Sequence, residues 1–135
     1  MLRVLLPVDG SESSTRAVQM AIQLYQRLAK VEVLLLHVEV VDGVPATALG
    51  DEGERAAEPV DPLARAKSLL DAAGVPHTSE MRRGYVPAAI AEYAKTMRCD
   101  AIVMGTRGLG STGDVVGSIA RQVIALSDLP VTLVK

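Results

Sequence analysis

The chain has 135 residues, which is the size of a single domain. Apolar residues make up 49% of it and aromatic residues only 2%, so its core must be aliphatic, while the net charge of −2 gives no reason to expect DNA or RNA as a partner. The single cysteine, Cys99, excludes an internal disulfide framework and predicts a reducing, cytoplasmic environment. No apolar run reaches the ~18 residues of a membrane span, and we expect no signal peptide.

The first half of the chain predicts two strands and two helices. The short apolar segment 2–8 is typical of a strand buried on both faces. Apolar residues then recur at helical spacing, which predicts a helix over 12–29. Residues 31–41 return to a nearly continuous apolar run, the second strand. A second helix is expected from Pro62 to Gly74, because glycine is common just past a helix end.

Residues 42–61 interrupt this pattern with glycine, proline and acidic residues. Such a segment has little apolar area to bury against the entropic cost of ordering, so we expect it to be the most mobile region. Because it follows the end of a strand, its position predicts a lid beside a ligand site.

The second half predicts three strands and two helices. The strand 77–82 is polar and is expected near a sheet edge, and a helix follows the segment 84–87. The apolar strand 100–104, a helix through 116–126 and a closing strand 131–134 complete the chain. Strands that alternate with helices predict an α/β, doubly wound, five-stranded parallel sheet with helices on both faces. Ligands of such folds bind outside the carboxyl ends of the strands, where the strand order reverses.

A glycine-rich loop follows the fourth predicted strand and leads into a helix. Its five glycines fall within thirteen residues, namely Gly105, Gly108, Gly110, Gly113 and Gly117. Backbone N–H groups in such a loop, with a helix dipole behind them, favour an anion. The loop lacks the GxxxxGK[ST] pattern of a Walker A loop, and it follows the fourth predicted strand, which is not the place of a dinucleotide GxGxxG loop. From composition alone, a phosphate-binding loop and a plain surface connection both stay open.

Four stretches carry a more specific resemblance, namely 4–11, 35–38, 99–108 and 127–134. Together they resemble the universal stress protein family, of the small, single-domain bacterial kind, over nearly all of 1–135 except 42–61. The resemblance implies a Rossmann-like fold of the adenine-nucleotide-binding type and a stress-response or regulatory role. It also implies a homodimer in which the last strands, Val131–Val134, pair antiparallel across a two-fold axis.

The ATP-binding class of that family carries the pattern G-x2-G-x9-G-[ST]. Here Gly105 and Gly108 match its first half and Gly117-Ser118 its second, but the spacer 109–116 has eight residues. One residue turns a helix by about 100°, so the shorter spacer predicts weaker contacts between the second half and phosphate. The glycines inside the spacer are the alternative, because they can absorb the difference.

Carried over by position, the resemblance implies a set of nucleotide-binding residues. The adenine and ribose would be contacted by Pro7, Val8, Asp9 and Val38. The phosphates would be surrounded by Gly105, Gly108, Gly117 and Ser118, with Met104 and Ile119 lining the pocket and Arg107 offsetting phosphate charge. ATP would bring Mg²⁺ or Mn²⁺, held mainly through phosphate and water.

Several of these residues and their neighbours also have plain structural roles. Asp9 can stabilise the start of the first helix, and Val38 can simply fill the core. His37 and His77 lie in different strands without other ligands at metal spacing, so no metal site made by protein alone is expected. Cys99 is expected to pack inertly against a buried strand.

Three functions therefore stay open for the sequence. The leading one is an adenine-nucleotide-binding stress or regulatory protein that acts as a dimer with a protein partner of unknown identity. The second is a dimeric interaction module that no longer binds ATP, for which the short spacer is the evidence. The third is a slow nucleotide hydrolase, for which Asp9 and Asp114 are the only nearby candidates for a base or metal positioner. No nucleophile with an adjacent base is recognisable, so no catalytic residue is expected.

Overall fold

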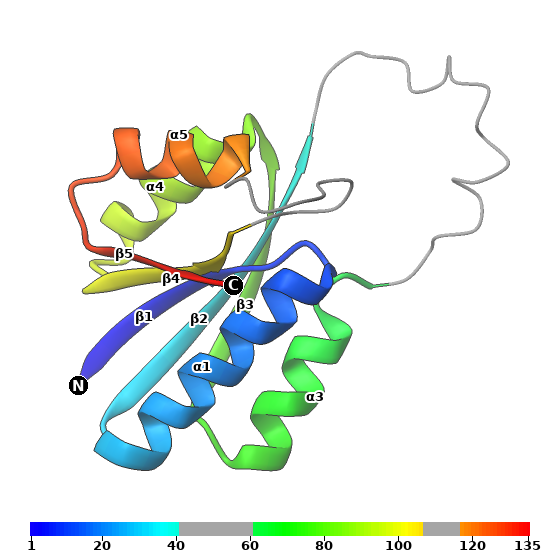
Figure 1. Cartoon of the computed structure of the whole chain (residues 1–135), viewed down its shortest axis with the longest axis vertical. Helices are drawn as coiled ribbons and strands as arrows, with labels where there is room; N and C mark the ends of the chain where they lie inside the picture. Colours follow the sequence, from blue (N-terminus) through cyan, green and yellow to red (C-terminus); the bar gives the residue numbers. More distant parts are fainter. Residues whose placement is uncertain (41–60, 107–116) are drawn as a thin grey trace, which may run out of the picture.

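The computed structural model describes residues 1–40, 61–106 and 117–135, and in these the predicted alternation of strands and helices is confirmed (Figure 1). Its elements are β1 (Leu2–Pro7), α1 (Glu12–Leu28), β2 (Val31–Val40), α3 (Ala64–Ala73), β3 (His77–Gly84), α4 (Val86–Thr96), β4 (Ala101–Gly105), α5 (Ser118–Leu126) and β5 (Val131–Val134). None of the helices within these ranges is long and apolar enough to cross a bilayer. The segment expected to be mobile, 42–61, lies outside the described residues except for Asp61.

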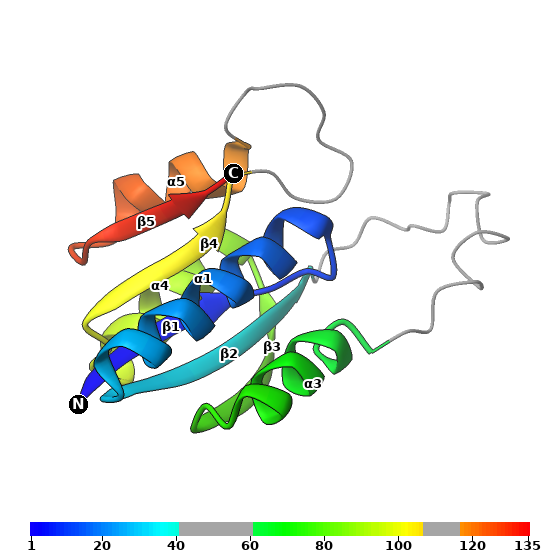
Figure 2. The same cartoon turned by 60° about the horizontal axis from the view of Figure 1, so that its bottom comes forward.

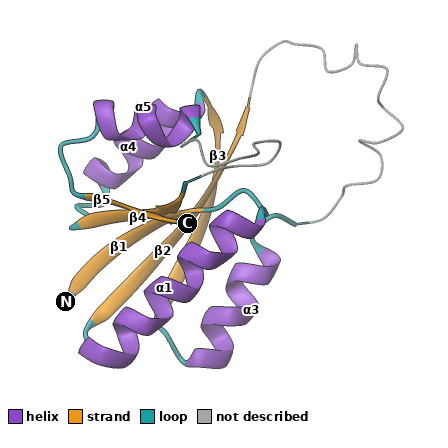
Figure 3. Ribbon diagram, viewed as in Figure 1, coloured by secondary structure: helices purple, strands orange, loops and turns teal. Residues whose placement is uncertain are grey.

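The five strands form one parallel sheet in the order β3-β2-β1-β4-β5. The chain first winds from β1 outward to β3 and then returns to add β4 and β5 on the other side of β1. Helices α1 and α3 cover one face of the sheet and α4 and α5 cover the other (Figures 2 and 3). The predicted doubly wound α/β sheet is confirmed, and its strand order reverses between β1 and β4.

Alternating side chains of the central strands fill two separate cores. Val4 and Leu35 belong to the core under α1 and α3, whereas Leu5 and Leu34 belong to the core under α4 and α5. Successive side chains of a strand point to opposite faces, so a strand covered on both faces must be apolar at nearly every position. Burying one such leucine contributes about 1.5–3 kcal/mol to stability.

Strand β3 lies at the sheet edge, as its polar sequence predicts. It runs two residues beyond the predicted end, to Gly84, because Arg83 and Gly84 still pair with Glu39 and Val40 of β2. The edge carries two ion pairs, with Arg83 Nε 3.6 Å from a Glu39 oxygen and Arg82 Nε 2.9 Å from a Glu80 oxygen. Charges of this kind discourage a further strand from pairing there.

Local capping explains where two of the helices begin and end. Helix α1 starts after Ser11, whose Oγ accepts a hydrogen bond from the backbone N–H of Ser14 at 3.1 Å. Helix α3 starts at Ala64 rather than at Pro62, because residues 62–63 form a turn in which the Asp61 carboxylate accepts from the N–H of Leu63. It ends at Gly74, which adopts the predicted left-handed conformation with φ of 71°.

Candidate functional site

A cavity of about 360 Å³ opens at the carboxyl ends of β1, β2 and β4. The first turns of α4 and α5 close it from one side of the sheet. Its described lining consists of Pro7, Val8, Asp9, Ser14, Leu36, His37, Val38, Val40, Val86, Ile90, Met104, Gly105, Thr106, Gly117, Ser118, Ile119 and Ala120. The cavity therefore lies where the strand order reverses, which is the place expected for a ligand of this fold.

The structure brings most of the sequence-predicted contact residues together around this cavity. Nine of the eleven line it, namely Pro7, Val8, Asp9, Val38, Met104, Gly105, Gly117, Ser118 and Ile119. The other two, Arg107 and Gly108, lie outside the described residues. Segments far apart in the sequence thus form one concave surface.

Sequence reasoning missed the contribution of α4 and of His37. Val86 and Ile90 line the cavity from the first turn of α4, and His37 lines it from β2. The spacing of Val86 and Ile90, four residues apart at the start of a helix, was the available signal for an inward-facing pair. Helices α4 and α5 are also joined at this end, where the Tyr85 hydroxyl donates a hydrogen bond to Gln122 Oε1.

The turn after β1 forms one wall of the cavity. The Asp9 carboxylate accepts a hydrogen bond from the backbone N–H of Ser11 at 2.9 Å, and Gly10 adopts a φ of +87°. Only glycine takes such a φ without strain, and the turn delivers the chain into the N-cap of α1. The structural role considered for Asp9 at the start of α1 is therefore present, and the same side chain borders the cavity.

The start of α5 supplies backbone donors to the opposite side of the cavity. The N–H of Gly117 donates to the Thr106 carbonyl oxygen at 2.6 Å, and the first helical bond runs from Arg121 N–H to the Gly117 carbonyl. The N–H groups of the intervening residues 118–120 therefore have no acceptor within the helix. All three residues line the cavity, and the positive end of the helix dipole lies there. This geometry suits an anion.

Gly105 is a glycine for a steric reason. A Cβ at this position would lie 2.1 Å from Ser13 Oγ and 2.6 Å from the Ser13 carbonyl carbon. The end of β4 therefore packs directly on the first turn of α1, which leaves no room for a side chain. The next residue, Thr106, donates its N–H to the Val134 carbonyl oxygen at 3.1 Å, so β5 is tied to the same point.

Ionisable side chains are few around the cavity. In the described lining they are Asp9 and His37, and the rest of the wall is mainly aliphatic. Within 1–40, 61–106 and 117–135, no three His, Cys, Asp or Glu side chains are grouped so that they could hold a metal ion. Cys99 is buried outside this lining, and its burial raises the pKa of the thiol.

Comparison with known proteins agrees with this architecture. The chain matches the model of the universal stress protein family over residues 1–135. It is 32% identical over 145 aligned positions to Universal stress protein MJ0531 of Methanocaldococcus jannaschii, covering 98% of this chain and 81% of that protein. It is similar to the solved structure of hypothetical protein MJ0577, with a TM-score of 0.78, 26% identity and coverage of 98% and 94% of the two chains.

Structural relatives bind adenine nucleotides. A universal stress protein solved in complex with cAMP is 27% identical, with a TM-score of 0.73 and coverage of 99% of this chain and 97% of that chain. At 24% and 21% identity, the same fold occurs in proteins from Archaeoglobus fulgidus, solved with dAMP, and Arabidopsis thaliana, solved with AMP. On the match over its whole length and the identity to curated relatives, this chain belongs to the universal stress protein family.

Proposed function

We propose that this protein binds an adenine nucleotide, ATP included, in the cavity at the carboxyl ends of β1, β2 and β4. The nucleotide acts there as a regulatory ligand in a stress response rather than as a rapidly turned-over substrate. One observation carries the proposal: a single cavity joins an aliphatic wall to the amides at the start of α5, which have no acceptor within the helix. A planar apolar base and a phosphate need these two surfaces together.

The base side of the cavity is formed by β1, β2 and α4. Val38 is buried at the end of β2, and Val86 and Ile90 face it from α4. Aliphatic side chains here would pack on the faces of adenine, while Asp9 offers a carboxylate to its amino group. The relative solved with cAMP supports adenine as the base.

The phosphate side is formed by the chain around α5. Backbone N–H groups of residues 118–120 and the Ser118 hydroxyl are the described donors. They suit one phosphate group, and the described lining adds no lysine or arginine for further ones. A triphosphate would therefore come with Mg²⁺ or Mn²⁺ held through its own oxygens and water.

The proposal extends to a homodimer built on β5. This strand lies at the sheet edge opposite β3 and carries the apolar side chains Val131, Leu133 and Val134, each half-buried. Whereas β3 protects its edge with ion pairs, the described residues of β5 carry no charge. An apolar edge without such protection favours pairing with a second copy of the chain.

Two measurements on the purified protein test nucleotide binding. Mass spectrometry of the supernatant after heat denaturation should find a co-purified adenine nucleotide. Calorimetry should then give saturable binding of AMP and of ATP with Mg²⁺ to protein stripped of ligand. The absence of binding in calorimetry would contradict the proposal and leave the non-binding interaction module, whereas conversion of ATP to ADP during incubation would indicate slow hydrolysis.

A matched pair of variants tests whether the nucleotide binds in this cavity. Val40→Glu adds a negative charge at an exposed position of the lining and should weaken AMP binding through repulsion of the phosphate. Met81→Glu adds the same charge at an exposed position of β3 outside the lining and should leave affinity unchanged. Equal effects of the two variants would show that the nucleotide binds elsewhere.

A further inference from the structure

The wall of the cavity after β1 is held by a side chain of the neighbouring strand. The ladder between β1 and β2 continues to Val8, whose N–H donates to the Leu36 carbonyl oxygen at 2.9 Å. Beyond it Gly10 turns the chain away from the sheet. In a regular parallel ladder the N–H of Val38 would donate to the Val8 carbonyl oxygen, but among the described residues no backbone N–H donates to it. His37 takes that place, with Nδ1 2.8 Å from the Val8 carbonyl oxygen.

The chemistry of this contact fixes the imidazole. A carbonyl oxygen only accepts hydrogen bonds, so Nδ1 of His37 must carry the hydrogen. The contact is partly buried, where an unsatisfied carbonyl costs more than the net worth of the bond that it loses. The His37 ring is therefore a specific support for one backbone carbonyl.

The direction of its side chain distinguishes His37 from its two neighbours in β2. Leu36 and Val38 belong to the core under α4 and α5, on the cavity side of the sheet. Side chains alternate along a strand, so His37 points to the other face, as Leu35 does. His37 thus lines the cavity from β2 next to the turn after β1, and its imidazole acts on that turn through the Val8 carbonyl.

We propose that His37 is a positioning residue of the nucleotide site. Its Nδ1–H holds the Val8 carbonyl and thereby fixes Pro7, Val8 and Asp9 in the conformation that receives the base. This inference rests on the proposed function for its effect on binding, but the hold on the backbone is a property of the chain itself.

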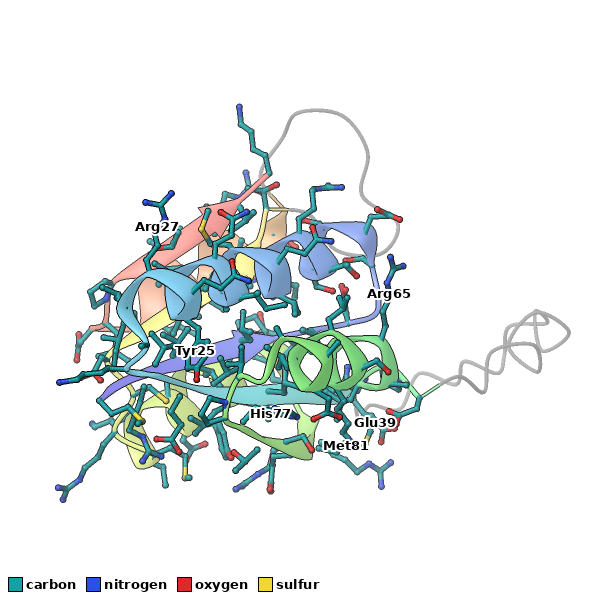
Figure 4. The ribbon with its side chains drawn as sticks, turned by 90° about the horizontal axis from the view of Figure 1, so that it is seen from below. Tyr25, Arg27, Glu39, Arg65, His77 and Met81 are labelled. Atoms are coloured by element: carbon teal, nitrogen blue, oxygen red, sulfur yellow. The ribbon has the colours of Figure 1, made fainter. Side chains whose placement is uncertain are left out.

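The second histidine of the chain provides a matched control. His77, at the start of β3, also places Nδ1 2.8 Å from a backbone carbonyl oxygen, that of Val75. It lies against α3, where its Nε2 is 3.4 Å from an Asp71 oxygen, and it is outside the described cavity lining (Figure 4). His77→Leu therefore removes the same kind of hydrogen bond away from the site.

Calorimetry with AMP and with adenosine on four proteins tests the inference. His37→Leu should weaken both ligands by about tenfold, which corresponds to roughly 1.4 kcal/mol. His37→Asn keeps an N–H donor near the position of Nδ1 and should restore most of the affinity. His77→Leu should bind as the wild type does. The ratio of the two dissociation constants should stay constant, because the phosphate side is untouched.

Two measurements without ligand separate failure of this inference from failure of the proposed function. Nitrogen NMR of the wild-type protein should find the hydrogen of the neutral His37 ring on Nδ1. Hydrogen exchange of the Ser11 amide, which donates to Asp9, should be faster in His37→Leu and normal in His77→Leu. Unchanged exchange, a hydrogen on Nε2, wild-type affinity of His37→Leu or equal weakening by His77→Leu would each overturn the role of His37. Absence of AMP binding by the wild type would overturn only the nucleotide site.

Discussion

At the scale of single residues, Gly105 shows how a glycine in a binding motif also serves packing. The motif assigns it to a phosphate loop, whereas the structure places its Cα against the backbone of Ser13 in α1. The contact lets the first turn of α1 approach the end of β4, and this approach brings Ser14 and Gly105 into one cavity lining. A substitution here is therefore expected to affect stability as well as binding.

Gly105→Ala should lower the free energy of unfolding by about 1–3 kcal/mol, because the new methyl group forces α1 and β4 apart. Urea denaturation followed by circular dichroism measures it. Ser13→Gly should not rescue the variant, since the carbonyl carbon and oxygen of Ser13 would still lie 2.6 and 2.7 Å from the added Cβ. Full rescue would mean that only the serine hydroxyl matters.

Cys99 has a pKa raised by burial, which gives a pH dependence with a definite sign. The thiol of the unfolded chain loses its proton at a lower pH than the thiol of the folded protein. The contribution of the protonated Cys99 thiol to folding stability is therefore complete below about pH 8.5 and is lost as the pH rises. We expect Cys99→Ala to lose less stability than the wild type between pH 7.5 and pH 10 in urea denaturation. Tyr93, whose pKa is raised mainly by burial and also by Cys99, stays in both proteins, and removal of Cys99 changes its contribution in the same direction as the prediction. Equal losses would contradict the prediction.

At the scale of elements, the two edges of the sheet differ in how they meet solvent. β3 carries the charged residues Glu80, Arg82 and Arg83, whereas β5 is short and largely apolar. The bonds from Ile102 N–H to the Pro130 carbonyl and from Thr106 N–H to the Val134 carbonyl show that the even-numbered residues from 130 to 134 face β4. In a parallel ladder the N–H of Leu133 therefore points away from the sheet, where a second copy would pair with it.

Proline substitutions in β5 test the proposed dimer. Leu133→Pro removes an outward donor and should convert a dimer into a folded monomer, as measured by light scattering at micromolar concentration. Thr132→Pro removes a donor directed at β4 and should instead lower stability. A monomeric wild type, or a dimer that survives Leu133→Pro, would contradict pairing through this strand.

At the scale of the whole molecule, the site depends on how distant segments are tied together. Thr106 links β4 to β5 through Val134 and to α5 through Gly117. The two described residues that flank 107–116, Thr106 and Gly117, are therefore hydrogen-bonded to each other. The position of the α5 amides is set by this tie and by the packing of Ala120 and Val123 in the core, and not by the loop alone.

The eight-residue spacer predicts weakened phosphate contacts, and the hydrogen bond between Gly117 and Thr106 provides the alternative outcome. If one charge-assisted hydrogen bond to phosphate is lost, worth about 1.5–3 kcal/mol, affinity falls by about one to two decades, and ATP and ADP bind nearly equally. Inserting one apolar residue between Val116 and Gly117 should restore both affinity and discrimination in calorimetry. Gly108→Val should abolish binding by blocking backbone approach. Unchanged affinity after the insertion would show that the hydrogen bond from Gly117 to Thr106 already holds the N–H groups at the start of α5 in place for phosphate.

The amino-acid sequence by itself determined the class of fold and most of the candidate site. Nearly continuous apolar runs such as 31–40 mark strands buried on both faces, the polar run 77–84 marks an edge, and Gly74 marks a helix end. These features are encoded in local spacing and in the conformational preference of single residues. The motif resemblance then named nine residues that the structure places around one cavity.

Only the tertiary structure decided which side chains support that site. The hydrogen bond of His37 to the Val8 carbonyl joins adjacent strands, the contact of Gly105 with Ser13 joins a strand to a helix, and Val86 meets the cavity from α4. Each depends on strand register and on how closely a helix approaches the sheet. Register and approach are set by the packing of the two cores, in which many distant side chains take part at once, so no local pattern in the sequence specifies them.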